Sequence, residues 1–531
     1  MTQFMMMAGF ILLICIIVNQ VAYKLPVPSL VFFLFLGMLF GVNGIFQIEF
    51  DDYALSEIVC STCLVFIMFY GGFGTNIRQA RSVLLPSCLL STLGVVLTAA
   101  TIGIFVYFIF GLTLYQSLLV GSVLCSTDAA SVFNVLRSKN LALKDHTDSL
   151  LEIESGSNDP FSYMMTLIFA TLCIGESVSV LSMVVLQLGI GILCGLVVGK
   201  GLLLLMDKVD SMTSAEQTIL FLIAAFLSYG IASVLQGNGY LSVYICGIWM
   251  GKGTLANKKE LVHFFDVVTE NCQMVIFFLL GLLVTPSQLS NSLIPALLIS
   301  VFMIFVARPI ICFLLLKPFK FQNNRILVIS FAGLRGVASI VFAIMAVMKG
   351  VPLPVSLFNI VFLVVLISLL FQGTLLSQVA KKLNVVDPQG NVFKTFNDYQ
   401  DEADISFVQL TITQNHPFTN HKIKDLDLPH ELLAVLVIKD ETYTMPNGDT
   451  MLEPECTLVL AARTFADPQD VHMKEISIDA HHKWCNKVIK DLSANQKLLI
   501  VMIKRQKEII VPNGDTMIHE NDRIVLLKRH Q

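Results

Sequence analysis

The chain has 531 residues, of which 55% are hydrophobic and 14% charged. A soluble globular protein carries about 25% charged residues, so a soluble enzyme is excluded for most of the chain. The charge is also segregated, because 19 of the 35 Lys and Arg residues lie in residues 1–382 and 16 in the last 149 residues. The expected fold class is therefore an all-α polytopic membrane domain followed by small α+β modules. A net charge of −4 indicates no nucleic-acid partner.

Apolar stretches of about 20 residues, the length that crosses a bilayer, recur along the first 382 residues. They predict thirteen spans, at 4–22, 28–46, 57–72, 83–110, 116–136, 149–174, 179–205, 217–235, 239–251, 262–285, 293–316, 326–348 and 355–380. The first lacks the basic region and the small-residue cleavage site of a signal peptide, so we expect it to remain as a span.

The Lys and Arg residues of the loops predict the orientation of these spans. With the N-terminus outside, 16 of these residues fall in inner loops and one, Lys349, falls in an outer loop. The C-terminal region is then cytoplasmic. We expect a multi-pass protein of the inner cell membrane, surrounded by lipid.

Five ionisable side chains lie deep in the predicted spans, where a charge is costly and usually functional. They are Asp128, Glu154, Asp159, Arg308 and Arg335. At about 1.5 Å per helical residue, Asp159 lies near the midplane of the bilayer. A desolvated carboxylate there can hold a proton or a partly dehydrated alkali cation, but not both, which is the minimal requirement for exchange. In the alternative interpretation, Asp159 only pairs with an intramembrane arginine.

The span at 149–174 carries the densest polar cluster. On a helix, Glu154 and Asn158 are i,i+4 neighbours, as are Ser155 and Asp159, so all four lie on one polar arc. This arc is the expected wall of an ion site.

The remaining charges near this arc have simpler interpretations. Arg308 needs an anion, and Glu154 is its expected partner. Asp148 and Glu152 lie nearer the inner end of the same span, where they form either an acidic funnel that attracts cations or a solvated helix end.

Two spans carry small residues around their charged side chain. Hydroxylated residues precede Asp128, and Gly333 and Gly336 flank Arg335. Such segments can unwind, which lets Asp128 face positive half-helix N-termini and Arg335 offset negative half-helix C-termini. One interrupted acidic span and one later interrupted basic span indicate an inverted-repeat transporter with a midplane site. The glycines could instead mark close helix packing.

Five motifs carry a family resemblance. They are STDAA at 126–130, ESGSNDP at 154–160, GLLVTP at 281–286, ARP at 307–309 and GLRG at 333–336. With them the chain resembles monovalent cation/proton antiporters of the NhaP branch, particularly the potassium/proton antiporters called cell volume regulation protein A. The resemblance implies a 13-span fold with crossed, partly unwound helices, and a homodimer that works by an elevator-like motion.

The resemblance also implies residue roles. Asp159 is the implied carrier of cation and proton, and Asn158 before it implies electroneutral one-for-one exchange. Thr127 and Asp128 match the Thr-Asp pair of the family's unwound helix. Thr127, Ser155, Asn158 and backbone carbonyls could coordinate either potassium or sodium.

Two further positions are compared with the family. Glu154 and Arg308 match its structural Glu–Arg pair. Many relatives carry an acid just before the Gly-Gly that ends the third span, whereas this chain has Tyr70 before Gly71 and Gly72. No selectivity role of that acid carries over.

The C-terminal region contains an internal repeat. Residues 383–402 read as a polar linker, after which IKDL at 423–426 recurs at 489–492 and PNGDTM at 446–451 recurs at 512–517, a constant offset of 66. Two homologous modules follow. The predicted domains are an exchanger domain at 1–382, the linker, and modules at 403–465 and 466–531. Each module is predicted as strand, short helix, strand, Asn-Gly turn and strand.

The modules resemble the C-terminal ligand-sensing subdomain (TrkA-C-like) of regulators of potassium conductance and of potassium-uptake proteins. Such modules pair face to face, and some bind cyclic dinucleotides, which implies a small regulatory ligand. No Gly-x-Gly-x-x-Gly follows a strand, so the nucleotide-binding half of those regulators is not expected. His416, His430, His481 and His482 are expected to be surface residues rather than pH sensors.

These observations favour a secondary antiporter that exchanges a monovalent cation, expected to be potassium, for protons. A sodium/proton antiporter of the same fold is the alternative. A ligand-gated potassium channel would need a filter such as Thr-Val-Gly-Tyr-Gly, which does not occur. Neither a His-Glu-x-x-His zinc motif nor a Walker-A sequence occurs. We expect no enzymatic activity, catalytic residue, cofactor or bound metal cofactor.

Overall fold

The computed structural model of the chain describes residues 28–387 except 76–81, 140, 177, 210–211, 253–257 and 355, a few residues between 9 and 20, and most of residues 405–529. Most of the predicted span 4–22, the linker beyond residue 387, and His430, His481 and His482 lie outside the described residues. The chain forms two compact units, Met1–Asp401 and Glu402–Gln531.

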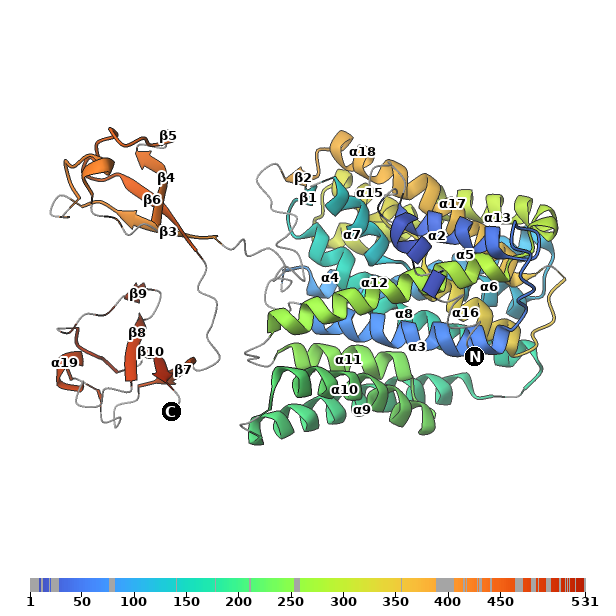
Figure 1. The fold of residues 1–531 in the computed structure, drawn as a ribbon. Helices are drawn as coiled ribbons and strands as arrows, with labels where there is room; N and C mark the ends of the chain where they lie inside the picture. The colour runs from blue at the N-terminus through green and yellow to red at the C-terminus, as the bar shows by residue number, and fades with distance from the viewer. Residues whose placement is uncertain are drawn as a thin grey trace. The chain divides into compact units, whose positions relative to one another are not determined.

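The first unit is helical, as predicted (Figure 1). Its helices are α2 (Ser29–Phe40), α3 (Tyr53–Gly74), α4 (Leu84–Leu89), α5 (Val95–Phe110), α6 (Leu114–Leu124), α7 (Ala129–Ser138), α8 (Thr147–Cys173), α9 (Val180–Lys208), α10 (Ser214–Val234), α11 (Gly239–Gly251), α12 (Lys258–Leu283), α13 (Ser290–Phe302), α14 (Arg308–Leu316), α15 (Asn323–Phe331), α16 (Val337–Met348), α17 (Leu357–Ile367) and α18 (Thr374–Lys382). Twelve of the thirteen predicted spans coincide with one of these helices or with a consecutive pair. Within the described residues, seven helical segments are long and apolar enough to cross a membrane.

Two groups of helices position the site. In one, α12 packs along α2 and α3, and α11 packs between α3 and α9 (Figure 1). In the other, α5 packs against α6 and α6 against α8. The first group is held by a buried aromatic cluster in which the rings of Phe69, Phe73, Phe221 and Phe265 are in contact.

Two predicted spans are interrupted at the places where the sequence predicts unwinding. The first breaks between Leu124, which ends α6, and Ala129, which begins α7. The second breaks between Phe331 and Val337, the facing ends of α15 and α16. Non-helical backbone at this depth requires protein partners for its N–H and C=O groups, so the two breaks define where the partners must be sought.

Three short π-helical segments lie inside the long spans of the part of the chain that the structure describes. They are η2 (Leu90–Gly94), η4 (Met303–Ala307) and η6 (Ser368–Gly373). Each widens its helix by one residue per turn, a feature that occurs often at functional sites. One of them ends just before Arg308.

A two-stranded sheet ties the end of the helical domain to the loop before α8. Strand β1 (Ala142–Leu143) pairs antiparallel with β2 (Val386–Asp387), which follows α18. The neighbouring Lys144 backbone N–H donates to the Val385 carbonyl at 2.8 Å. The first residues after α18 are therefore bonded to the loop that leads into α8.

The first module is a four-stranded antiparallel sheet with the order β3-β6-β4-β5. Its elements are β3 (Ile405–Thr411), the 3-10 turn η8 (Ile423–Asp425), β4 (Leu432–Lys439), β5 (Thr442–Thr444) and β6 (Thr457–Arg463). The predicted Asn-Gly turn exists, but it does not join two paired strands. Instead the Gly448 carbonyl accepts from the Lys424 backbone N–H at 2.9 Å, so the turn closes onto η8. Strand β5, which was not predicted from the sequence, pairs with β4.

The second module has the equivalent order β7-β10-β8-β9. Its elements are β7 (Val471–Ser477), α19 (Ile489–Leu492), β8 (Leu498–Arg505), β9 (Glu508–Ile510) and β10 (Arg523–Arg529). The buried cores repeat with the offset of 66, since Ile412, Val437, Leu452 and Leu458 correspond to Ile478, Ile503, Ile518 and Ile524. The sequence repeat is thus a repeat of the fold.

One buried ion pair distinguishes the two modules. Arg505 bonds both carboxylate oxygens of Asp522, which is fully buried. Burial by itself raises the pKa of Asp522, but bonds from Arg505 and from the His519 backbone N–H lower it below the ordinary value. The equivalent positions of the first module hold Lys439 and Cys456, so that core has no carboxylate at this place.

Candidate ion-binding site

The two interrupted helices bond to each other where they are unwound. The Asp128 backbone N–H donates to the Leu334 carbonyl at 2.9 Å, and Arg335 Nη1 donates to the Ser126 carbonyl at 2.6 Å. Backbone groups freed by one break are therefore satisfied by the other. The Arg335 cation lies against a carbonyl just beyond the C-terminus of α6, where a positive charge is favourable.

Asp128 caps the half-helix α7. Its carboxylate accepts from the Ser131 hydroxyl at 2.6 Å and from the Ser131 backbone N–H at 3.3 Å, which places negative charge at a helix N-terminus. Gly336 makes room for it, because a Cβ at that position would lie 2.0 Å from Asp128 Oδ2. A glycine of one broken helix is thus required by the acid of the other.

Helix α8 is bonded to the same crossing. The Ser126 hydroxyl donates to Asp159 Oδ1. Asn158 Nδ2 donates to Thr127 Oγ1 at 2.5 Å, and the Ser155 hydroxyl donates to the Thr127 carbonyl at 2.7 Å. The structure therefore brings together Thr127, Ser155, Asn158 and Asp159, the four residues singled out as ion ligands together with Asp128.

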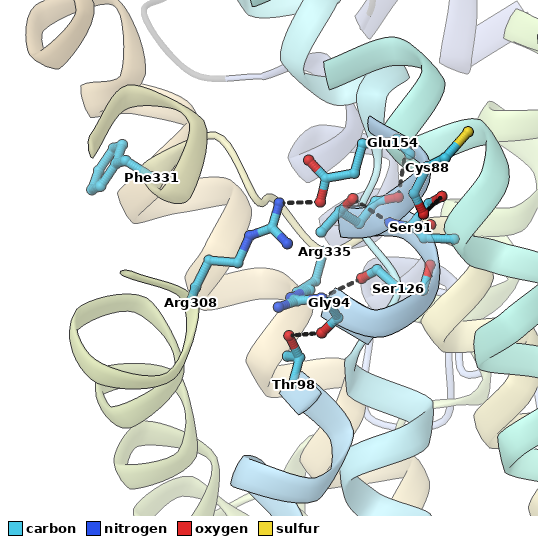
Figure 2. A network of polar contacts seen from close by, with 12 residues as sticks. Cys88, Ser91, Gly94, Thr98, Ser126, Glu154, Arg308, Phe331 and Arg335 are labelled. Atoms are coloured by element: carbon cyan, nitrogen blue, oxygen red, sulfur yellow. Dashed lines mark hydrogen bonds and ion pairs between the residues drawn. The ribbon is translucent and has the colours of Figure 1, made fainter. Parts of the chain in front are cut away.

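Glu154 and Arg308 form a buried ion pair, in which Arg308 Nη2 donates to Glu154 Oε1 (Figure 2). Their side chains are 1% and 4% exposed, so water screens the pair little. A Cβ at Gly333 would lie 2.8 Å from Arg308 Nε, so the glycine of the second break gives space to this guanidinium. Figure 2 shows Arg335 beside this pair, turned toward Ser126.

The second break is also anchored on its far side. The Arg335 backbone N–H donates to the Ser368 hydroxyl at 3.0 Å, and that hydroxyl donates to Gln372 Oε1 at 2.7 Å. Gln372 Nε2 in turn donates at 2.8 Å to the carbonyl of Phe331, which is the last residue of α15. The π-helical segment η6 thus supplies the polar partners that the unwound backbone needs.

A cavity of about 140 Å³ lies between the two groups of helices. Of the residues predicted for the site, Thr127, Asp128, Glu152, Ser155 and Asp159 line it. Asp159 is 7% exposed and Glu152 9%, so both are buried in protein yet border this space.

The other predicted residues are not among those that line the cavity. Asn158, Glu154, Arg308 and Arg335 lie behind its wall in the contacts described above. Asp148 lies in the first turn of α8, where its carboxylate accepts from the Ser149 backbone N–H at 2.8 Å. The structure therefore separates Glu152, which borders the cavity, from Asp148, which was grouped with it.

Sequence reasoning missed the contribution of α12. Asp266, Thr269, Glu270 and Gln273 line the cavity. Their spacing of i, i+3, i+4 and i+7 places them on one helix face, and this polar stripe within an apolar span was the available signal. Tyr70 also lines the cavity, and its hydroxyl donates to Asp266 Oδ1 at 3.2 Å.

The arrangement defines a class of protein. Carboxylates and hydroxyls surround a small buried cavity at the crossing of two broken helices, and such a crossing forms the central ion site of many secondary transporters. The chain is built as a membrane carrier for small cations.

Comparison with known proteins places the chain in the same class. The sodium/hydrogen exchanger transmembrane family matches residues 9–382, and the TrkA-C domain matches residues 407–464 and 473–527. The chain belongs to the sodium/hydrogen exchanger family, and it is a monovalent cation/proton antiporter.

Two relatives and one solved structure are similar over most of the chain. The K(+)/H(+) antiporter NhaP of Alkalimonas amylolytica is 33% identical over 87% of this chain and 81% of the relative. The K(+)/H(+) antiporter NhaP2 of Shewanella sp. (strain ANA-3) is 32% identical over 85% of this chain and 79% of the relative. The sodium proton antiporter MjNhaP1 from Methanocaldococcus jannaschii, solved at pH 8, has a TM-score of 0.62 and 23% identity over 70% of this chain and 100% of that chain. This last likeness concerns the fold.

Proposed function

We propose that the chain exchanges potassium for protons across the inner membrane of the cell, with Asp159 as the group that carries each in turn. The potassium/proton antiporters NhaP and NhaP2 support the choice of potassium, because both are more than 30% identical over most of their length. The proton gradient supplies the energy.

The observation that carries this proposal is the position of Asp159. Its carboxylate borders the cavity, accepts from the Ser126 hydroxyl, and is 7% exposed. A carboxylate so poorly hydrated needs a positive partner, and a proton and an alkali cation compete for that place. Thr127, Asp128 and Ser155 border the same cavity and can complete an oxygen shell for the dehydrated cation.

Asn158 supports electroneutral exchange. Its amide cannot titrate, and it donates to Thr127 rather than adding a second charge beside Asp159. One carboxylate that carries one potassium ion in one direction and one proton in the other moves no net charge. The membrane voltage then contributes nothing to the driving force, although it is worth about 2.3 kcal/mol per charge at 100 mV.

Transport by the purified protein in lipid vesicles tests the proposal. A pH-sensitive dye reports proton movement on addition of potassium, sodium, rubidium or lithium, with and without an imposed voltage. We expect potassium-driven proton flux that is independent of voltage. Asp159→Asn should abolish it in folded protein, and exchange near the wild-type rate would eliminate Asp159 as the carrier. Faster exchange with sodium would establish the sodium/proton alternative, and a current without proton flux would establish a channel.

The roles of the surrounding residues belong to the same proposal. Glu154 and Arg308 stabilise the domain as a buried pair, and Arg335 compensates the freed carbonyl of Ser126. Glu152 borders the cavity and attracts cations, with Asp148 closer to the start of α8.

We also propose an outside N-terminus, cytoplasmic modules and a homodimer with an elevator-like motion. The Lys and Arg distribution of the loops supports the orientation. Labelling of single cysteines placed in the loops of a cysteine-free variant tests it, since an impermeant reagent reaches only one side. Cross-linking in native membrane tests the dimer.

The two modules are proposed as a regulatory tail with boundaries at 403–465 and 466–531, after a linker at 383–402. Their match to the TrkA-C domain supports a small ligand, such as a cyclic dinucleotide. Calorimetric titration of the full chain with cyclic dinucleotides tests this, and the absence of binding for every one tested would remove that ligand class.

A further inference from the structure

One face of α12 borders the space beside the proposed carrier. Asp266, Thr269, Glu270 and Gln273 line the cavity that also contains Asp159. Asp159 belongs to α8, whereas these residues belong to the helix group of α2, α3 and α12. The cavity therefore has acidic side chains on both of its walls.

Tyr70 orients the first of these acids. Its hydroxyl donates to Asp266 Oδ1 at 3.2 Å, between residues that are 196 positions apart in the chain. The Tyr70 ring is held in place, since it is 5% exposed and stacks on Phe265 with centroids 6.4 Å apart. A phenol that donates to a carboxylate fixes its direction and leaves its negative charge in place.

The cavity concentrates negative charge. Five of the residues that line it are Asp or Glu, and none of the described lining residues is Lys, Arg or His. They are Asp128, Glu152, Asp159, Asp266 and Glu270. Carboxylates that share about 140 Å³ repel one another, so each is either neutralised by a proton or balanced by a nearby cation.

Gln273 gives an independent indication of a ligand. It is 5% exposed, lines the cavity one helical turn beyond Thr269, and forms no hydrogen bond to another described residue. A buried amide without a protein partner is costly unless a ligand or water satisfies it. Its carbonyl oxygen is a neutral ligand for an alkali cation.

We propose that Asp266, oriented by Tyr70, is a second cation-binding residue of the transport pathway, from which the cation passes to Asp159, with Gln273 as a neutral ligand on the same wall. This inference rests on the proposed role of Asp159. Ideal helical rise places Asp266 about 12 Å from the first residue of α12 and Asp159 about 18 Å from the first residue of α8. Both helices begin at the face assigned to the cytoplasm, so a cation from that side reaches Asp266 first.

Everted membrane vesicles test the inference, because their cytoplasmic face is accessible to added potassium. Asp266→Asn keeps the shape of the side chain and removes its charge. We expect the potassium KM to rise about tenfold while kcat stays within about twofold, because binding weakens and Asp159 remains. Tyr70→Phe should raise KM roughly threefold through loss of one hydrogen bond, and Asp266→Glu should restore KM to within about twofold of wild type.

A matched control variant separates a direct role of Asp266 in binding from a general effect of removing an acid from α12. Glu260→Gln makes the same acid-to-amide change on α12, but Glu260 is exposed, bonds Ser214, and is not among the residues that line the cavity. Its KM should be unchanged. Added choline chloride should reduce the difference in potassium KM between wild type and Asp266→Asn, because salt screens the attraction between the Asp266 carboxylate and potassium. A purely structural role for Asp266 would not produce this salt dependence.

The outcomes distinguish this inference from the function on which it rests. An unchanged KM in folded Asp266→Asn and Tyr70→Phe, alongside an inactive Asp159→Asn, would overturn the inference and keep the proposed carrier. Transport near the wild-type rate by Asp159→Asn would overturn the carrier itself. If Asp266→Asn does not fold, Tyr70→Phe decides, and wild-type KM in that variant would refute the role of the pair.

Discussion

Removal of one partner of the Glu154–Arg308 ion pair should destabilise the helical domain strongly. Both side chains are at least 96% buried, so the remaining charge would stay in protein without a counter-ion. Breaking a buried pair in this way costs about 3–5 kcal/mol. That is a large share of a typical folding stability of about 5–15 kcal/mol.

The structure also predicts which partner matters more. Arg335 lies near enough to both residues for its charge to interact with each. Glu154→Gln leaves Arg308 and Arg335 facing each other without an anion, so its cost should lie near about 5 kcal/mol. Arg308→Gln leaves Glu154 with Arg335 as a remaining cation, so its cost should lie near about 3 kcal/mol. The double variant should cost less than the sum of the two by about 2 kcal/mol or more.

Unfolding of the purified variants in mixed detergent micelles, followed by tryptophan fluorescence or by proteolysis, measures these differences. Glu260→Gln is the control, because an exposed acid that bonds one hydroxyl should change stability by about 1 kcal/mol or less. Glu154→Gln as stable as the control, or single effects that add without coupling, would refute the account of the pair.

Two further predictions concern the crossing and the tail. Gly336→Ala should abolish or strongly slow transport, because the added Cβ would lie 2.0 Å from Asp128 Oδ2. The control is Gly230→Ala, whose added Cβ would meet no atom within 4 Å, and it should transport like the wild type in the same vesicle assay. Unimpaired transport by Gly336→Ala would mean that the two broken helices can move apart to accept the added methyl group, and it would refute a strict need for glycine at this position. Truncation after Asp387 should leave transport active but change its activation. Truncation after Lys382 also removes β2, and it should lower the stability of the helical domain by a further ~1–2 kcal/mol, the contribution of a few backbone hydrogen bonds. Complete inactivity of folded protein cut after Asp387 would contradict a regulatory tail.

Hydropathy located the helical domain well because each span must bury an apolar stretch of about bilayer length, which is a local property. The two breaks were also readable, since Asp128 and Arg335 stand among small or hydroxylated residues inside apolar spans. The pairing of Glu154 with Arg308 was expected because a deep cation needs an anion and because both residues match the family's structural pair. The module repeat was visible because the offset of 66 is preserved without gaps, and the buried core positions keep it.

Tyr70 was noted in the sequence only as a departure from the family's acid, and nothing in the sequence linked it to Asp266. Each is ordinary when read alone, one as an aromatic residue in an apolar span and the other as an acid near a span end. Their hydrogen bond depends on the packing of α12 along α3, which no local period encodes. The stripe of polar residues on α12 was present in the sequence, but its orientation toward Asp159 was not.

The sequence by itself determined that this is a membrane carrier with two broken spans, a buried acid and a repeated tail, because apolar length, buried charge and repetition are written along the chain. The tertiary structure decided which charges meet. Asp128 lies at the start of α7 in contact with Gly336, and β2 pairs with the loop before α8. Asp266 lines the same cavity as Asp159. The physical reason is that an electrostatic interaction depends on distance in space, and helix packing fixes that distance between residues far apart in the chain.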